Sequence, residues 1–170
     1  MRSGKSLVGK QIISMEDGSR LGTVRDLYLD ASLSSVVAVF LGRESIISRK
    51  AKFIRRRDIN VLGIDAILVS GAKAIANRNR SKDYPKWIRR DYLQGRPVST
   101  PGGTKIANVG DVVIDESGGL IGLALTNMQV SSPIAEKRIV ARDTILDIGS
   151  ESSPMLIDLA KAEEQSKRKN

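Results

Sequence analysis

Six basic side chains lie within nine residues in the stretch SRKAKFIRRRD, which is the clearest candidate for chemistry in the sequence. They are Arg49, Lys50, Lys52, Arg55, Arg56 and Arg57. Like charges at this spacing repel one another unless an anionic surface meets them. One hypothesis is therefore an anion-binding site. The alternative is an edge strand whose charges prevent two sheets from pairing edge to edge.

The residues that most enzymes use for acid–base and nucleophilic chemistry are missing. The chain has no histidine and no cysteine, so it lacks the commonest general base, the thiol nucleophile and the usual zinc ligands. The remaining carboxylates and hydroxyl groups form no catalytic pair in the sequence, and no glycine-rich loop is suited to cradle a phosphate. We expect no catalytic residue, no cofactor and no metal site.

The formal net charge of +9 is unevenly distributed. Residues 71–96 hold eight basic and two acidic side chains, whereas residues 97–157 hold four basic and seven acidic ones. This asymmetry favours an anionic partner for the basic side of the molecule. No apolar run approaches the roughly 20 residues that span a bilayer, and the N-terminus lacks the apolar core of a secretory signal. We therefore expect a cytoplasmic protein.

One pattern occurs twice, 85 positions apart. The stretch RLGTVRDLYLD (20–30) returns as KIANVGDVVID (105–115), with apolar residues and two aspartates at matching places. Upstream, LVGKQI (7–12) matches LQGRPV (93–98) with the offset shifted by one residue. Two copies are too few for a solenoid, which needs three or more repeats to bury its core. The repeat therefore predicts a duplicated small domain.

Residues that both copies keep are expected to serve the architecture. Asp26 corresponds to Asp111, and we expect both to bond turn amides or to pair with arginine, rather than to form an ion site. Asp30 and Asp115 stand where turn chemistry favours aspartate. The dipeptide at 57–58 also recurs, at 142–143.

Residues that only one copy keeps are better candidates for function. Arg55 and Arg56 face apolar residues, Val140 and Ala141, in the second copy. The architecture therefore does not require these two arginines.

Each copy shows the pattern of short β-strands. In the first copy, apolar and β-branched runs at 11–15, 21–30 and 36–41 are separated by turn residues. About five short strands in some 65 residues favour a small closed barrel, because closure removes exposed strand edges.

The segment between the copies differs in kind, because it lacks the alternation of a strand. A short helix is expected from Asp83, which can cap it, to Gly95, which can end it. One face would hold Tyr84, Trp87, Ile88 and Tyr92, and the other would hold Lys86, Arg89 and Arg90. The aromatic face either pins the linker to a barrel or forms a basic, aromatic platform for nucleobases or a membrane interface.

These patterns resemble the PRC-barrel family, the small β-barrel of the photosynthetic reaction-centre H subunit and of ribosome maturation factors. The resemblance rests on VGKQIISMEDGSRLGTVRDLYLD, VVAVFLG and RRRDINVLGIDAILV in the first copy. In the second copy it rests on GRPVSTPGGTKIANVGDVVIDESGGLIGLAL and VARDTILDIG. It implies an assembly or adaptor role without catalysis. The membrane helix of the H subunit and the N-terminal domain of the maturation factors have no counterpart in this sequence.

The sequence thus predicts an all-β protein of two tandem PRC-like barrels joined by a short basic helical linker. The barrels are expected at 1–72 and 93–157, the linker at 73–92 and a charged tail at 158–170. We expect a non-catalytic adaptor that recognises the anionic surface of a protein or complex. Its predicted contact residues are Arg49, Lys50, Lys52, Arg55, Arg56, Arg57, Lys86, Trp87, Arg89 and Arg90.

Three alternatives for the partner stay open. RNA or a pre-ribosome would also be attracted by the basic charge. A peripheral position on an anionic membrane, beside a photosynthetic or respiratory complex, is the second. A homodimer is the third, in which the acidic second barrel packs on the first barrel of another copy.

Overall fold

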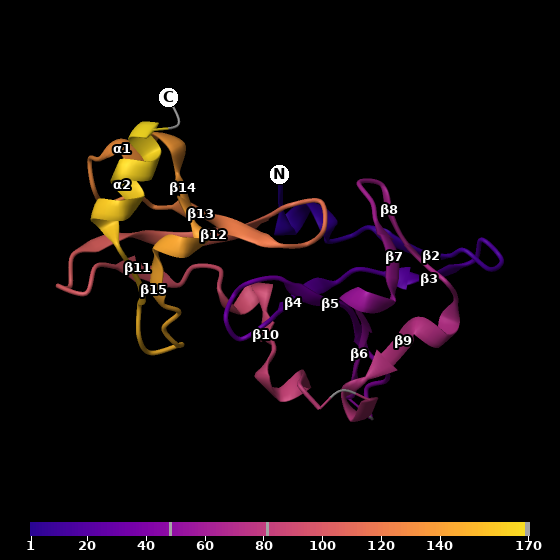
Figure 1. Cartoon of the computed structure of the whole chain (residues 1–170). Coiled ribbons are helices and arrows are strands. Elements are labelled where there is room, and N and C mark those ends of the chain that lie inside the picture. Colours follow the sequence, from indigo (N-terminus) through magenta and orange to yellow (C-terminus); the bar gives the residue numbers. More distant parts are fainter. Residues whose placement is uncertain (48, 81, 169–170) are drawn as a thin grey trace.

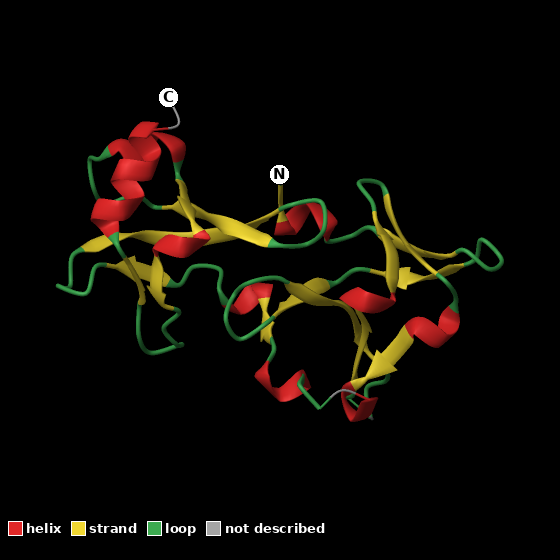
Figure 2. Ribbon diagram, viewed as in Figure 1, coloured by secondary structure: helices red, strands yellow, loops and turns green. Residues whose placement is uncertain are grey.

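The protein is built mainly from β-strands, with short helical turns between them (Figures 1 and 2). A computed structural model describes residues 1–47, 49–80 and 82–168. Three sheets are present among these residues, with seven, five and four strands. The predicted all-β class is confirmed in this coarse sense.

Between residues 11 and 69, the described part of the first half forms seven strands and one 3-10 turn. They are β2 (Gln11–Ser14), β3 (Arg20–Thr23), β4 (Asp26–Leu29), β5 (Val36–Arg43), β6 (Ala51–Arg55), η2 (Arg56–Asp58), β7 (Ile59–Leu62) and β8 (Ala66–Val69). One sheet has the order β3-β2-β8-β7, with β2 and β8 parallel. In the other, β5 lies between β4 and β6.

The second half repeats this arrangement. Its elements are β11 (Pro97–Ser99), β12 (Lys105–Ile114), β13 (Leu120–Thr126), β14 (Ile139–Ala141), η7 (Arg142–Thr144), β15 (Ile145–Asp147) and β16 (Met155–Ile157). The strand order is β14-β13-β12-β11-β16-β15, with β11 and β16 parallel. The single long strand β12 occupies the place that β3 and β4 share in the first half. With that substitution, the strand order matches that of the two first-half sheets taken together.

The sheets are open among the described residues. No ladder joins β6 to β7, or β14 to β15, in this part of the chain. In each half a 3-10 turn, η2 or η7, directly follows one of these strands and leads into the other. The expected closure of each half into a barrel is therefore not seen.

The two halves exchange their leading strands. β1 (Arg2–Ser3) precedes the first half but pairs with β12 of the second. β10 (Ile88–Arg89) precedes the second half but pairs with β4 of the first. The 3-10 turns η1 (Gly4–Leu7) and η6 (Arg90–Tyr92) then return the chain to its own half.

This exchange is accompanied by a shared interior. Leu7 and Leu93, which follow the exchanged strands, are almost completely buried. One apolar cluster contains residues of both halves, including Leu29 and Val36 of the first and Ile114 of the second. Separating the halves would therefore expose a common core.

The middle segment forms strands and 3-10 turns in place of the predicted helix. β9 (Ile75–Asn77) pairs with β6 and β10 pairs with β4, so the segment supplies both edges of the five-stranded sheet. Besides η6, the described part of the segment contains the 3-10 turns η3 (Ala72–Ala74), η4 (Arg78–Arg80) and η5 (Tyr84–Lys86). The helix was a wrong prediction because pairing with β4 requires extended backbone from Trp87 onward.

The C-terminal residues form a helix that packs on the second half. α2 (Leu159–Arg168) lies against α1 (Pro133–Lys137) and β14 (Figure 1). Ala162 is buried in this contact, and Lys161 pairs with Asp143 at 2.9 Å. The charged tail predicted at 158–170 therefore forms a helix over Leu159–Arg168. Residues 169 and 170 lie outside the described residues.

Candidate anion-binding groove

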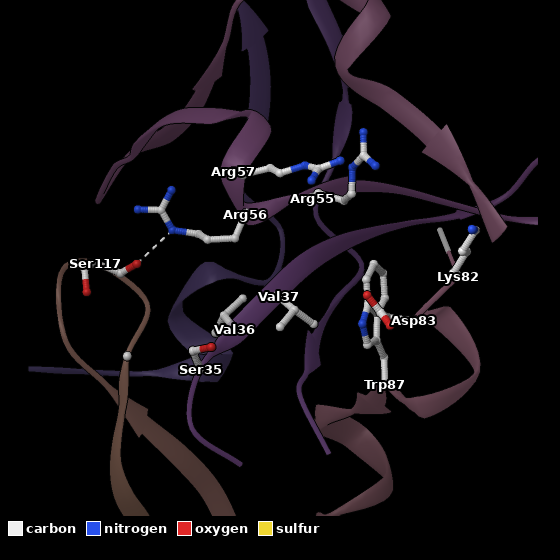
Figure 3. A pocket seen from close by; sticks show the side chains of 11 residues that line it. Ser35, Val36, Val37, Arg55, Arg56, Arg57, Lys82, Asp83, Trp87 and Ser117 are labelled. Carbon is white, nitrogen blue, oxygen red and sulfur yellow. Dashed lines mark hydrogen bonds between the residues drawn. The ribbon is translucent and has the colours of Figure 1, made fainter. Parts of the chain in front are cut away.

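A groove of about 680 Å³ lies where the two halves and the middle segment meet (Figure 3). Its walls come from η2, the start of β5, residues 82–87 and the turn at 117–119. Three of the predicted cations line it together: Arg55, Arg56 and Arg57. Lys82 adds a fourth, and Asp83 is the one acidic side chain in the lining.

Arg56 is held in place by backbone carbonyls. Its Nε donates to Ser117 O at 2.8 Å (Figure 3). Its Nη1 donates to Ile59 O at 3.2 Å. Its second amino group has no hydrogen bond to any residue that the structure describes. This arginine therefore joins the halves and keeps donor capacity for a ligand.

Arg142 makes the corresponding contact in the second half, where its Nε donates to Leu33 O at 3.1 Å. Arg56 and Arg142 are each the first residue of their 3-10 turn, and each reaches across to the equivalent turn of the other half. The expectation that the architecture does not require Arg56 is therefore wrong. The repeated Arg-Asp dipeptide is part of the architecture at its second occurrence, as expected.

The other groove cations differ in how tightly they are held. Arg55 pairs with Asp58, with Nε 2.9 Å from Oδ2. Arg57 and Lys82 are exposed, and neither forms a hydrogen bond or ion pair with the described residues. Donors therefore outnumber acceptors in the groove, which suits an anion rich in oxygen acceptors.

Trp87 forms a wall of the groove and is fixed by an aromatic cluster on the five-stranded sheet. Its ring centroid lies 5.1 Å from that of Phe53 and 5.7 Å from that of Tyr28. Tyr84 stacks on Phe53 at 5.5 Å, and its hydroxyl lies 3.2 Å from that of Tyr28. Burial, reinforced by this hydrogen bond, raises the pKa of Tyr28 above its usual range. Trp87 and Tyr84 thus pin the middle segment to the first half.

The remaining predicted contact residues lie away from the groove. Arg49, Lys50 and Lys52 belong to the hairpin at the opposite end of β6. Lys86 is exposed but does not line the groove. Tyr92, expected beside Trp87, is 61% exposed and lies near Arg89 instead.

Arg89 and Arg90 do not belong to an exposed contact surface, which corrects the sequence-based expectation. Arg89 lies over the ring of Phe40 at 4.5 Å, and its Nη2 is 2.6 Å from an oxygen of Asp91. Arg90 is only 6% exposed. Both side chains are engaged by residues of the protein itself.

Arg90 bridges the two repeated aspartates. Its Nε donates to Asp26 at 2.8 Å and its Nη1 donates to Asp111 at 2.9 Å. The second oxygen of each carboxylate accepts a backbone N–H, from Asp91 and Lys5 respectively. The expectation that these aspartates bond amides and pair with arginine is confirmed.

Asp30 and Asp115 organise equivalent turns, as expected. An oxygen of Asp30 accepts the N–H groups of Ser34 and Ser35, and an oxygen of Asp115 accepts that of Gly119. Burial raises the pKa of Asp30, but hydrogen bonds from the serines outweigh it and lower the pKa overall. Hydrogen bonds also lower the pKa of Asp115.

The sequence did not identify Lys82 or Ser117 as groove residues. Neither has a distinctive local pattern, and they join the site only because distant segments meet there. In the described ranges, no three carboxylates are grouped to hold a metal ion, and no helix is long and apolar enough to cross a membrane. No protein-family model and no curated protein matches the chain.

Proposed function

We propose that the protein is a non-catalytic binding or adaptor protein with two PRC-like modules, and that its groove recognises an anionic protein surface. The observation that carries the proposal is the convergence of Arg56, Arg57 and Lys82 beside Trp87. Arg57 and Lys82 have no acidic partner among the described residues, so a bound carboxylate would not have to displace one.

The fixed position of Arg56 supports this proposal. Two carbonyl contacts restrict its guanidinium before a ligand arrives, which lowers the conformational entropy lost on binding. The charge distribution supports it as well, because the groove cations lie in the basic first half and middle segment. Acidic proteins would be steered toward this side.

The test uses the tagged full chain, purified from native lysate at low salt, and a variant with Arg57→Glu and Lys82→Glu. A control with Lys73→Glu and Lys105→Glu has the same change of net charge at exposed positions outside the groove. A protein partner that the control retains and the groove variant loses would support the proposal. Equal retention by both variants would refute the groove assignment.

RNA is the second candidate, because Trp87 adds an aromatic wall next to the groove cations. Nuclease treatment of the same preparation separates the two candidates. For RNA, a plot of log affinity against log salt concentration should have a slope of about −2. Arg56, Arg57 and Lys82 would neutralise three phosphates of a single strand, at about 0.7 each, whereas Arg55 already pairs with Asp58. A nuclease-resistant protein partner would favour the adaptor proposal.

A further inference from the structure

The hairpin between β5 and β6 exposes two adjacent isoleucines to solvent. Ile46 is 93% exposed and Ile47 is 96% exposed, more than any other large apolar residue that the structure describes. Single exposed apolar residues are common on soluble proteins. Here two exposed isoleucines are adjacent at the tip of a hairpin, where they form a small apolar surface.

The hairpin backbone presents this tip away from the core. The N–H of Glu44 donates to Lys50 O at 2.8 Å, which keeps the two arms together. The N–H of Arg49 donates to Ser45 O at 3.1 Å, and Arg49 has a positive φ of 46°, which turns the chain back toward β6. Ser48 lies outside the described residues.

Basic residues flank the apolar tip along both arms of the hairpin. Arg43 and Lys52 lie on the arms, where Arg43 is opposite Ala51 and Lys52 is opposite Gly42. Arg49 and Lys50 follow the tip, and Glu44 is the one acidic residue of the hairpin. The exposed side chain of Arg25 lies beside Gly42.

We propose that this hairpin docks on an anionic lipid bilayer, with Ile46 and Ile47 inserted at the interface. The basic residues along the arms of the hairpin would then lie at the level of the headgroup phosphates. Exposed apolar side chains flanked by basic residues are suited to a membrane surface. There, apolar contact with the lipid and electrostatic attraction to anionic headgroups act together.

A lipid surface fits the tip better than a second protein does. Two isoleucines cannot supply the roughly 800 Å² that each partner buries in a standard protein interface. The tip is also separate from the anion-binding groove, because the five residues of β6 place the two about 17 Å apart. A protein partner and a membrane could therefore be bound together.

The absence of cysteine permits a direct test. Ile47→Cys provides a single site for an environment-sensitive dye, and Ile64→Cys provides a matched control at an isoleucine that is 78% exposed. Vesicles of phosphatidylcholine with about a quarter phosphatidylglycerol should shift the dye emission to the blue at position 47 only. Pure phosphatidylcholine vesicles should have little effect.

Sedimentation with the same anionic vesicles measures binding. Ile46→Asp with Ile47→Asp should lower the bound fraction about tenfold, while Ile64→Asp should leave it unchanged. The groove variant with Arg57→Glu and Lys82→Glu should still bind, which separates this inference from the proposed function. No sedimentation of the wild type, or equal sedimentation of the tip variant, would overturn the proposal. So would a dimer that forms without lipid and is lost in the tip variant.

Discussion

Gly4 and Arg90 occupy equivalent places at the junction of the two halves, and the space there admits only one side chain. The backbone N–H after Gly4 donates to Asp111, just as the N–H after Arg90 donates to Asp26. A Cβ on Gly4 would lie 2.9 Å from Arg90 Cδ and 2.5 Å from Val112 Cγ2. The guanidinium of Arg90 therefore serves both aspartates because Gly4 leaves room for it.

Gly4→Ala should destabilise the protein by about 1–3 kcal/mol, because the added methyl overpacks a buried junction. Urea unfolding followed by circular dichroism would measure the change in the free energy of unfolding. Gly102→Ala is the matched control, since its Cβ would meet only Thr100 Oγ1 at 3.8 Å. A loss of stability at Gly102 as large as that at Gly4 would contradict the packing explanation.

Arg90→Met should destabilise the protein by about 3–5 kcal/mol, because it removes the cation that two buried carboxylates share. Asp26 would keep only the longer contact of 3.5 Å with Arg89 Nε. Arg89→Met should cost less, since its cation lies closer to solvent. Chemical denaturation of both variants at neutral pH provides the comparison.

A second set of variants separates charge from packing at Arg90. Asp26→Asn and Asp111→Asn, added to Arg90→Met, should recover part of the lost stability because the amides carry no charge to desolvate. If the triple variant loses as much stability as its three single variants lose when added together, the loss at Arg90 comes from packing alone.

Asp30→Asn should reduce stability at neutral pH and have little effect in acid. The pKa of Asp30 is lowered from its ordinary value of 3.8, so the folded state favours the carboxylate. The stability from this group is present above pH 3.8 and is lost as the pH falls through the lower folded pKa. The free energies of unfolding of wild type and variant should therefore differ at about pH 7 and converge near pH 3. A constant difference across this range would exclude the ionic contribution.

Tyr28→Phe should make the protein less sensitive to alkali. The pKa of Tyr28 is raised above its ordinary value of 10.0, so the unfolded state loses the phenolic proton first. Stability from the neutral phenol is complete below pH 10 and declines as the pH rises beyond it. The midpoint temperature of thermal unfolding should fall more steeply with increasing pH for wild type than for the variant. At neutral pH the variant should lose only about 1 kcal/mol, from the hydrogen bond to Tyr84.

Several features could be read directly from local sequence. The repeated stretches predicted equivalent strands, and these appear as β3 and β4 in the first half and as β12 in the second. The turn roles of Asp30 and Asp115 also followed from the sequence, because an aspartate bonds amides only a few residues away. The edge-strand alternative for the basic run at 49–57 was wrong, because β6 lies between β5 and β9 and strand pairing is not a local property.

Other features depended on contacts between distant segments. Arg90 and Lys86 have the same charge and stand four residues apart, yet one is buried between Asp26 and Asp111 and the other is exposed. The expected linker helix also failed for this reason, because pairing with β4 is more favourable than the local helical tendency of residues 83–95.

The composition and repeat of the chain therefore indicated the main strands of the two copies, the turns that join them and the segments where positive charge accumulates. Only the tertiary structure decided that β1 and β10 cross to the opposite halves, that one arginine serves both repeated aspartates and that Lys82 joins the groove. Strand propensity and turn chemistry act over a few residues, whereas each of these outcomes depends on partners more than 20 residues apart that meet only when the shared core is buried.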